Sequence, residues 1–466
     1  MVIRKNILFL IFILSNAVFG QVNLPVVPQA PQIPNYSNQN YSNPNNRNVA
    51  PNHLEIPDGN NDQRRQQLQN EKLMREVEQN EKQKTEILNQ VKKGNSGFDS
   101  ENNGINYILP SLANQKGTEY YRQVYDKMLN LNIENYSVKD VNFDIENAYF
   151  ENKLEKEEFD KIIKQTAEFI LAKMKEKNFD VNSNTAKNFI LFEFFSQPMQ
   201  VKGFKEKHFP IKYDFEDYWG RQNWSKMFVT KLLKTNTGQC HSMPLLYLTL
   251  AEAIDAEAYL SLSPNHSYIK FQDEKEKWYN LELTNAMFTV SSFVLNNGYI
   301  TAEAVQNKIY MQNLTKQQLL SQFYTDLASG YLHKFGYDVF VEQVINKALE
   351  LYPASINANM VKANYDTERL KYVVKKLGIN TGTQEGREKI LQYPKAVELL
   401  KEMQTQYKLI DDLGFQQMPA DAYENWLGSL KNEKHKQDNE KEKEQLKRLT
   451  KALNEAKNKI DKQNKS

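Results

Sequence analysis

The chain has 466 residues, of which 40% are hydrophobic and 25% charged, a composition that excludes a wholly disordered, collagenous or polytopic membrane protein. Its 60 Lys and Arg residues nearly balance 58 Asp and Glu residues, so no broad positive charge attracts nucleic acid or an anionic membrane. The single cysteine excludes an internal disulfide framework and any cysteine-rich zinc or iron–sulfur site.

Residues 1–20 have the pattern of a signal peptide. Arg4 and Lys5 precede an apolar run from Ile7 to Leu14, and Gly20 stands where a signal peptidase would cut. The run is too short to span a bilayer. We therefore expect export to the periplasm or the cell exterior, without an integral membrane anchor.

The next two segments are predicted to lack a packed core. Residues 21–61 are rich in proline and asparagine, with seven prolines and few large apolar groups. Such a stretch cannot repay the entropy of ordering, so we predict a disordered linker. Residues 62–104 turn to Gln, Glu, Lys and Arg with scattered apolar residues, which predicts a polar helix followed by a loop.

Globular character begins near residue 105, and residues 105–297 are predicted to form the first folded domain. Apolar residues recur at helical spacing over 120–131, 156–177 and 183–196. The segment from Lys212 to Gly220 is acidic and aromatic. It could line a cleft, or it could be an ordinary exposed loop with buried rings.

Residues 298–430 are predicted to form an all-helical domain, with helical spacing over 302–310, 316–334, 339–351 and 355–377. Consecutive helices joined by a short turn resemble a degenerate tetratricopeptide unit, although any bundle of helical hairpins gives the same pattern. The charged tail, 431–466, spaces its apolar residues by three and four. This spacing predicts either a partly frayed helix or a weak coiled-coil contact with a partner.

The stretch from Thr235 to Asn285 carries the residues that can do chemistry. Turn and capping residues precede Cys240, and an apolar helix with Pro244 in its first turn follows it. Cys240 is therefore predicted at a helix N-terminus, where the helix dipole and free N–H groups lower the thiol pKa. His241 comes next, but adjacent side chains on a helix point about 100 degrees apart, so we expect it either to pack or to support the reacting residues indirectly.

Three strands are predicted downstream, over 256–263, 266–271 and 278–284, with a hairpin loop between the last two. In an antiparallel pair of strands, the residue numbers of two directly opposed residues always add up to the same sum. Side-chain alternation favours a sum of 548, which places the apolar Ile269, Phe271 and Leu281 on one face. The same register sets His266 opposite Glu282 on the other face.

In thiol enzymes a thiol serves as the nucleophile, an imidazole as the base, and a nearby carboxylate as the group that orients the base. We predict these roles for Cys240, His266 and Glu282, with Asn280 as the alternative orienting group. The backbone N–H of Cys240 is the first candidate for an oxyanion donor. The sequence leaves four candidates for the second donor: Gln222, Asn223, Trp224 and Gln239. No phosphate loop, nucleotide fingerprint or zinc-binding pair occurs in the sequence, so we expect no cofactor and no metal.

Three runs together resemble the core of the transglutaminase-like superfamily, which shares its layout with papain-like thiol enzymes. They are Thr237–Cys240 opening an apolar helix, Asn265–Ile269 starting a strand, and Trp278–Thr284. The resemblance implies an α+β fold in which the nucleophile, at a helix N-terminus, packs on a small antiparallel sheet, and here an all-α region of helical hairpins follows. It also implies Cys240 as nucleophile, His266 as base, and Glu282 in the position that usually holds an aspartate.

Members of that superfamily are amide hydrolases, peptidases, acyl-transferring cross-linkers or inactive binding domains, so two functions are open. The first is an exported, cysteine-dependent amide-bond hydrolase or acyl transferase, which acts through a thioester on a protein, peptide or isopeptide substrate. The second is a catalytically inactive scaffold that binds a protein partner through its C-terminal helices. The intact set of Cys240, His266 and Glu282 favours the first, and long polar helices at both ends of the chain favour the second.

Overall fold

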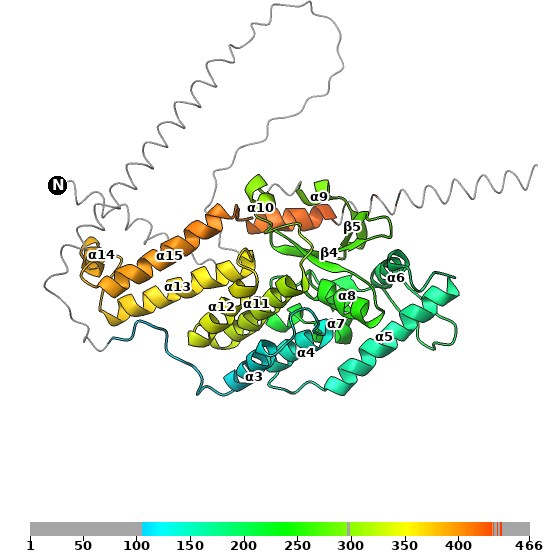
Figure 1. Ribbon diagram of the computed structural model, residues 1–466, viewed down its shortest axis with the longest axis horizontal. Coiled ribbons are helices and arrows are strands. Elements are labelled where there is room, and N and C mark those ends of the chain that lie inside the picture. The colour runs from blue at the N-terminus through cyan, green and yellow to red at the C-terminus, as the bar shows by residue number, and fades with distance from the viewer. Residues whose placement is uncertain (1–104, 296–298, 431, 433–435, 437–438, 440–466) are drawn as a thin grey trace, which may run out of the picture. The chain divides into compact units, whose positions relative to one another are not determined.

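The computed structural model describes residues 105–295 and 299–430, together with positions 432, 436 and 439 (Figure 1). The expected signal peptide (1–20), linker (21–61), polar helix and loop (62–104) and nearly all of the charged tail (431–466) lie outside the described residues. The described residues belong to two compact units. The larger unit contains residues 107–373 and 398–430, and the smaller one contains residues 105–106 and 374–397.

The fold is a mixture of helices and a small antiparallel sheet, in agreement with the α+β class predicted from the sequence. The helices before the sheet are α3 (Thr118–Leu129), α4 (Val138–Tyr149), α5 (Lys156–Glu176), α6 (Asn184–Ser196), the 3-10 helix η1 (Trp224–Met227), α7 (Val229–Thr235) and α8 (Ser242–Ala253). Those after it are α9 (Ser291–Leu295), α10 (Ala302–Gln306), α11 (Lys316–Phe335), α12 (Val339–Leu351), α13 (Ile356–Lys376), α14 (Gln384–Ile390) and α15 (Pro394–Asp412). A further helix, which we call the C-terminal helix, covers residues 420–430.

The sheet has four antiparallel strands in the order β3 (Tyr259–Ser263), β4 (His266–Gln272), β5 (Trp278–Glu282) and β6 (Met287–Thr289). The three predicted strands are confirmed, with ends that differ by a few residues. The sequence did not predict β6, because a three-residue strand is too short to show alternation. A separate two-stranded pair, β1 (Lys212–Tyr213) and β2 (Thr237–Gly238), is parallel.

The predicted register of β4 and β5 is wrong by two residues. Ile269 pairs with Leu281 and Gln272 pairs with Trp278, so the paired numbers sum to 550 rather than 548. The loop between the two strands is held by the Asp273 carboxylate, which accepts hydrogen bonds from the N–H groups of Lys275 (2.9 Å) and Lys277 (2.8 Å). A shift of two keeps each side chain on its predicted face, so alternation alone could not detect it.

One face of the sheet packs on helices and forms the main core of the larger unit. Ile269, Phe271 and Leu281 are almost fully buried there, and strand β4 contacts α6 and α8. Helix α8 is apolar on all sides because it also contacts α4, α5 and α7. This packing fixes the start of α8 relative to the start of β4.

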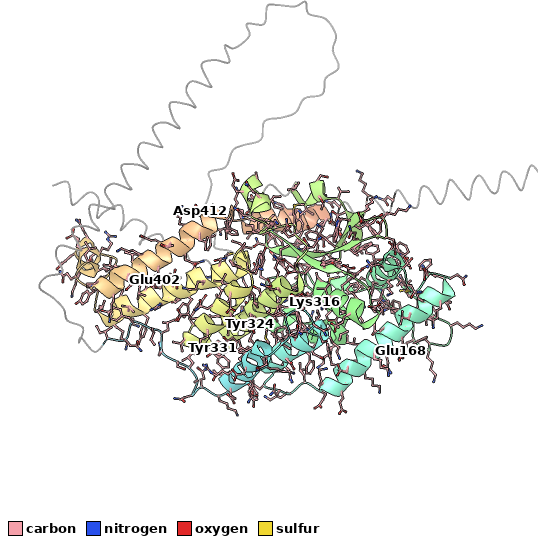
Figure 2. All side chains as sticks on the ribbon, viewed as in Figure 1. Glu168, Lys316, Tyr324, Tyr331, Glu402 and Asp412 are labelled. Atoms are coloured by element: carbon pink, nitrogen blue, oxygen red, sulfur yellow. The ribbon has the colours of Figure 1, made fainter. Side chains whose placement is uncertain are left out.

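Helix α11 packs against α12, α3 and α4, so helices from both predicted domains share one core. Its Tyr324 and Tyr331 are fully buried (Figure 2). The described elements after residue 299 are helices, as the spacing predicted. The tetratricopeptide resemblance and the boundary near residue 297 remain predictions. Within residues 105–295 and 299–430, no helix combines the length and apolar character needed to cross a bilayer.

The smaller unit contains the end of α13, the whole of α14 and the start of α15. Thr383 begins α14, because its hydroxyl accepts a hydrogen bond from the Gly386 N–H at 3.1 Å. A Cβ atom on Gly386 would lie 1.9 Å from the Asn380 carbonyl oxygen. Only glycine fits there without a change of backbone.

Candidate active site

The backbone before Cys240 is held by the β1–β2 pair, in which Tyr213 lies beside Gly238. A Cβ atom on Gly238 would lie 2.5 Å from the Leu232 Cδ1 atom and 2.6 Å from the Met243 Cγ atom. Glycine therefore lets the chain pass between α7 and α8 on its way to Cys240. Helix α8 starts at Ser242 with His241 as its N-cap, so Cys240 lies one residue before the cap, close to the predicted place.

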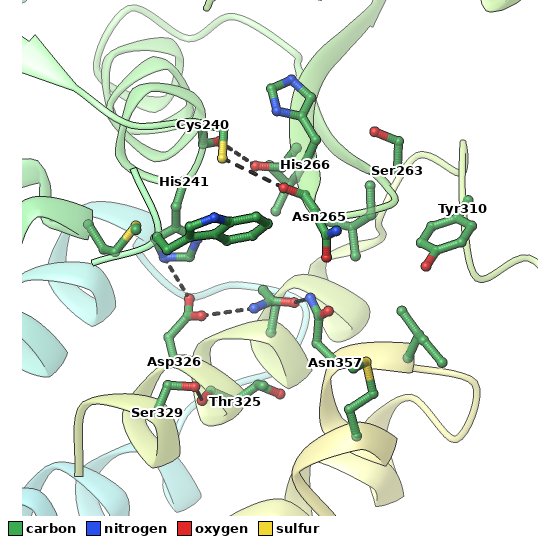
Figure 3. Close-up of a pocket in the computed structure, with 18 of the residues that line it drawn as sticks. Cys240, His241, Ser263, Asn265, His266, Tyr310, Thr325, Asp326, Ser329 and Asn357 are labelled. Carbon is green, nitrogen blue, oxygen red and sulfur yellow. Dashed lines mark hydrogen bonds and ion pairs between the residues drawn. The ribbon is translucent and has the colours of Figure 1, made fainter. Parts of the chain in front are cut away.

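Two hydroxyl groups fix the backbone around Cys240. The Ser267 hydroxyl donates to the Cys240 carbonyl oxygen at 2.5 Å, and the Gln239 N–H donates to the Ser242 hydroxyl at 2.9 Å. The Cys240 Sγ atom lies 4.0 Å from the carbonyl oxygen of Asn265, the residue before His266 (Figure 3). The structure thus brings the start of α8 next to the start of β4, as predicted.

His266 and Glu282 form a buried pair on the face of the sheet opposite the helical core. The Nε2 atom of His266 lies 2.7 Å from Glu282 Oε2, and the two side chains are only 1% and 5% exposed. Glu282 Oε1 accepts the Thr284 N–H at 2.9 Å, so the carboxylate is fixed through both oxygens. The Trp426 ring meets the imidazole edge-on, with ring centroids 4.7 Å apart.

The remaining ring nitrogen of His266, Nδ1, is the one available to the thiol. It is buried and accepts or donates no hydrogen bond in the described part of the chain. Burial opposes ionisation of Cys240, but the neighbouring His266 outweighs it, with help from Tyr423 and His241, and lowers the pKa of the Cys240 thiol. Burial opposes protonation of His266, but Glu282 and Cys240 outweigh it and raise the pKa of that imidazole. Both shifts act in the direction of a thiolate–imidazolium pair.

A residue from the far end of the chain also contacts the sulfur. The hydroxyl of Tyr423, on the C-terminal helix, donates to Cys240 Sγ at 3.7 Å. Burial, and next the charge of Cys240, raise the pKa of Tyr423 well above its ordinary value, so the phenol keeps its proton. Its ring packs on Trp219, with centroids 4.8 Å apart.

A cavity of about 130 Å³ opens beside Cys240 (Figure 3). Its apolar wall includes side chains from η1, β3 and α13: Trp224, Leu260, Leu262, Ile356 and Met360. Tyr218 and Trp219 also line it, so the acidic and aromatic segment predicted from Lys212 to Gly220 does reach a cleft. Cys240 shares this cavity with side chains of α11 and α13.

His241 lines this cavity together with Cys240, so of its two predicted roles, packing or indirect support of the reacting residues, its position fits the second. Its Nε2 atom lies 3.4 Å from Asp326 Oδ2 (Figure 3). Asp326 Oδ1 in turn accepts from Gln322 Nε2 at 2.8 Å, and Gln322 Oε1 accepts from Asn357 Nδ2 at 3.0 Å. Burial opposes protonation of His241, but Asp326 outweighs it and raises the pKa of His241. The thiol thus lies near two imidazole–carboxylate pairs.

The structure narrows the candidates for a second oxyanion donor. Trp224 lines the cavity, whereas Gln222 and Asn223 are exposed and do not. Gln239 is fully buried, and its side-chain amide has no hydrogen-bond partner within the described ranges. The alternative orienting group, Asn280, shares a strand with Glu282, but its side-chain amide donates to the Ser291 hydroxyl at 3.4 Å, whereas Glu282 lies against His266. Sequence reasoning missed Tyr423 and Asp326, because only the folded chain brings them to Cys240.

Within residues 105–295 and 299–430, no group of three or more His, Cys, Asp or Glu side chains is placed to hold a metal ion. Comparisons of the chain with models of protein families, with curated proteins and with solved structures found no match.

Proposed function

We propose that the protein is a thiol-dependent acyl-transfer enzyme, which cleaves an amide bond of a peptide, isopeptide or related substrate through a thioester on Cys240. The observation that carries this proposal is the position of His266, whose imidazole is fixed by Glu282 on one nitrogen and faces the thiol with the other. Such chemistry needs a nucleophile, a base beside it and a group that orients the base, and Cys240, His266 and Glu282 supply these three roles.

The steps follow from the side chains present. The Cys240 thiolate attacks the amide carbonyl carbon, a C–S bond forms, and the carbonyl electron pair moves to oxygen. When the C=O bond reforms, the C–N bond breaks and the leaving nitrogen takes the proton from His266 Nδ1. Water or an amine then attacks the thioester carbonyl carbon while His266 takes its proton, the C–S bond breaks, and the acyl product departs, which leaves Cys240 as the thiolate. Glu282 keeps the ring oriented and stabilises the imidazolium throughout.

The resemblance to the transglutaminase-like core supports the same proposal. Cys240 at the start of α8, His266 at the start of β4 and Glu282 at the end of β5 follow the order and the element types of that superfamily. The signal peptide expected at residues 1–20 would put the activity in the periplasm or outside the cell. Whether water or an amine accepts the acyl group depends on the substrate and on access of water to the cavity.

An activated ester tests the proposal without knowledge of the natural substrate. Incubation with p-nitrophenyl acetate should release a burst of nitrophenol and leave an acetyl group on Cys240, detected by intact mass and removed by hydroxylamine. The Cys240→Ser variant should show neither, and His266→Gln should acylate far more slowly. A wild-type protein whose Cys240 stays unacetylated would overturn the proposal.

The second candidate function is a scaffold without catalysis, and one observation favours it. Tyr423 and Trp426 of the C-terminal helix pack directly on Cys240 and His266, which restricts access to both. The same ester experiment separates the two candidates, because a scaffold needs no activated thiol.

A further inference from the structure

The C-terminal helix (420–430) is fastened to the loops that carry the candidate triad. The Asn265 side-chain amide donates to the Met418 carbonyl oxygen at 3.4 Å, and the Asn285 amide donates to the Leu430 carbonyl oxygen at 2.8 Å. The Tyr218 hydroxyl donates to the Glu424 carboxylate at 2.6 Å. Contacts at both ends and in the middle fix the helix across the site.

Tyr423 of this helix brings a polar hydrogen to the sulfur of Cys240. The Tyr423 ring is 1% exposed and lies in an apolar cluster with Trp219, Met418 and Trp426. Its hydroxyl lies 3.7 Å from Cys240 Sγ and borders the cavity. The rings around Tyr423 leave the hydroxyl little freedom to turn away.

We propose that Tyr423 is a catalytic residue, whose hydroxyl donates to the Cys240 sulfur in the resting enzyme and to the acyl oxygen of the tetrahedral intermediate. This inference rests on the proposed function. In the first step the new C–S bond places the acyl carbon next to Sγ, so its oxygen falls within reach of a donor that already contacts the sulfur. The Tyr423 O–H bond stays intact, and the charge moves only from sulfur to oxygen. Tyr423 and the Cys240 N–H would then be the two donors to the oxyanion.

The chemistry explains why a phenol suits this position. Tyr423 keeps its proton at neutral pH, so it can donate but cannot take the place of His266 as a base. If Tyr423 is the second oxyanion donor, that role does not fall to Trp224, the candidate from the sequence that lines the cavity. Trp224 is then part of the apolar wall. The stacking of Trp224 on His333, with centroids 3.9 Å apart, fits that structural role.

Two reactions of the same thiol test the proposal with the Tyr423→Phe variant. Alkylation by iodoacetamide needs the thiolate but forms no oxyanion, whereas acetylation by p-nitrophenyl acetate needs both. We expect acetylation to slow about 100-fold, because removal of one oxyanion donor costs about 10² to 10³ in rate. Alkylation at its high-pH plateau should change less than about threefold. Tyr324→Phe is the matched control, since Tyr324 is equally buried but lies away from the cavity.

The rates of acetylation and alkylation together separate the possible roles of Tyr423. Acetylation and alkylation slowed by the same factor would mean that Tyr423 only supports the fold, and acetylation at the wild-type rate would mean that its hydroxyl is not used. Either result overturns this inference while the proposed function stands. Failure of the wild-type protein to be acetylated on Cys240 would instead overturn the proposed function itself.

Discussion

The imidazole of His266 lies 2.7 Å from the carboxylate of Glu282, and both side chains are almost closed to water. A charged pair is costly to bury unless each member has a further partner. Here Glu282 also accepts the Thr284 N–H, and His266 turns its other nitrogen toward Cys240. Burial of this pair costs free energy that a purely structural role does not require. A general acid–base group does require an imidazole that is oriented in this way.

The first prediction concerns Glu282. Glu282→Gln keeps the size of the side chain but removes the charge that stabilises the His266 imidazolium, so turnover should fall about 100-fold or more while the melting temperature changes little. Asn280→Ala is the matched control on the same strand. Steady-state rates and thermal unfolding would be measured for both. Unchanged turnover in Glu282→Gln would remove this carboxylate from the mechanism.

The second prediction concerns the approach to Cys240. Gly238→Ala places a methyl group against Leu232 and Met243, and such overpacking should cost about 1 to 3 kcal/mol in the free energy of unfolding. Gly428→Ala, in the C-terminal helix with no heavy atom within 4 Å of the added Cβ, should stabilise the protein by up to about 1 kcal/mol. Denaturant unfolding would compare them. Equal stability of the two variants would contradict the packing described here.

The third prediction concerns the pair of His241 and Asp326. Asp326 favours the protonated form of His241, and that charge favours the Cys240 thiolate. Asp326→Asn should therefore raise the pKa of Cys240, by less than removal of His266 does. Glu146 and Cys240 are the other charged groups that act on His241, and both remain in this variant. Asp144→Asn, which loses a surface pair with Lys127, is the control and should leave the alkylation profile unchanged.

The fourth prediction concerns Glu146, a buried carboxylate of α4 that accepts hydrogen bonds from the start of α7. It accepts hydrogen bonds from the N–H groups of Val229 (2.7 Å) and Thr230 (2.8 Å) and from Asn142 Nδ2 (2.8 Å). Glu146→Ala leaves these donors buried without acceptors, so unfolding should become easier by about 3 kcal/mol. Glu146→Gln keeps one carbonyl acceptor and should lose less. A loss below about 1 kcal/mol in Glu146→Ala would mean that water replaces the carboxylate.

The helix and strands that carry the candidate site could be located from the sequence. Apolar spacing located α8 and strands β3 to β5, and turn chemistry located Cys240 just before the helix. Alternation fixed which residues share a face of the sheet. It could not fix the register, because a shift of two residues preserves every face and depends on how the Asp273 carboxylate closes the loop.

Residues that reach the site from distant segments could not be predicted. Tyr423 is 183 positions from Cys240, and Asp326 lies on a helix assigned to another predicted domain. Neither belongs to a motif with a fixed spacing. The sequence could not decide between packing and a supporting role for His241, because helical angles say where neighbouring side chains point relative to each other, and not which of them faces a cavity.

The most direct test of the central claim is the rate of Cys240 alkylation by iodoacetamide as a function of pH. The thiolate fraction rises as pH passes the lowered pKa of Cys240, so the wild-type curve should inflect well below about 8.5, the value of a free thiol. His266→Gln should move the inflection upward. Acyl transfer should also fall at high pH, as His266 loses its proton above its raised pKa. A wild-type inflection at or above about 8.5, unchanged in His266→Gln, would contradict the account.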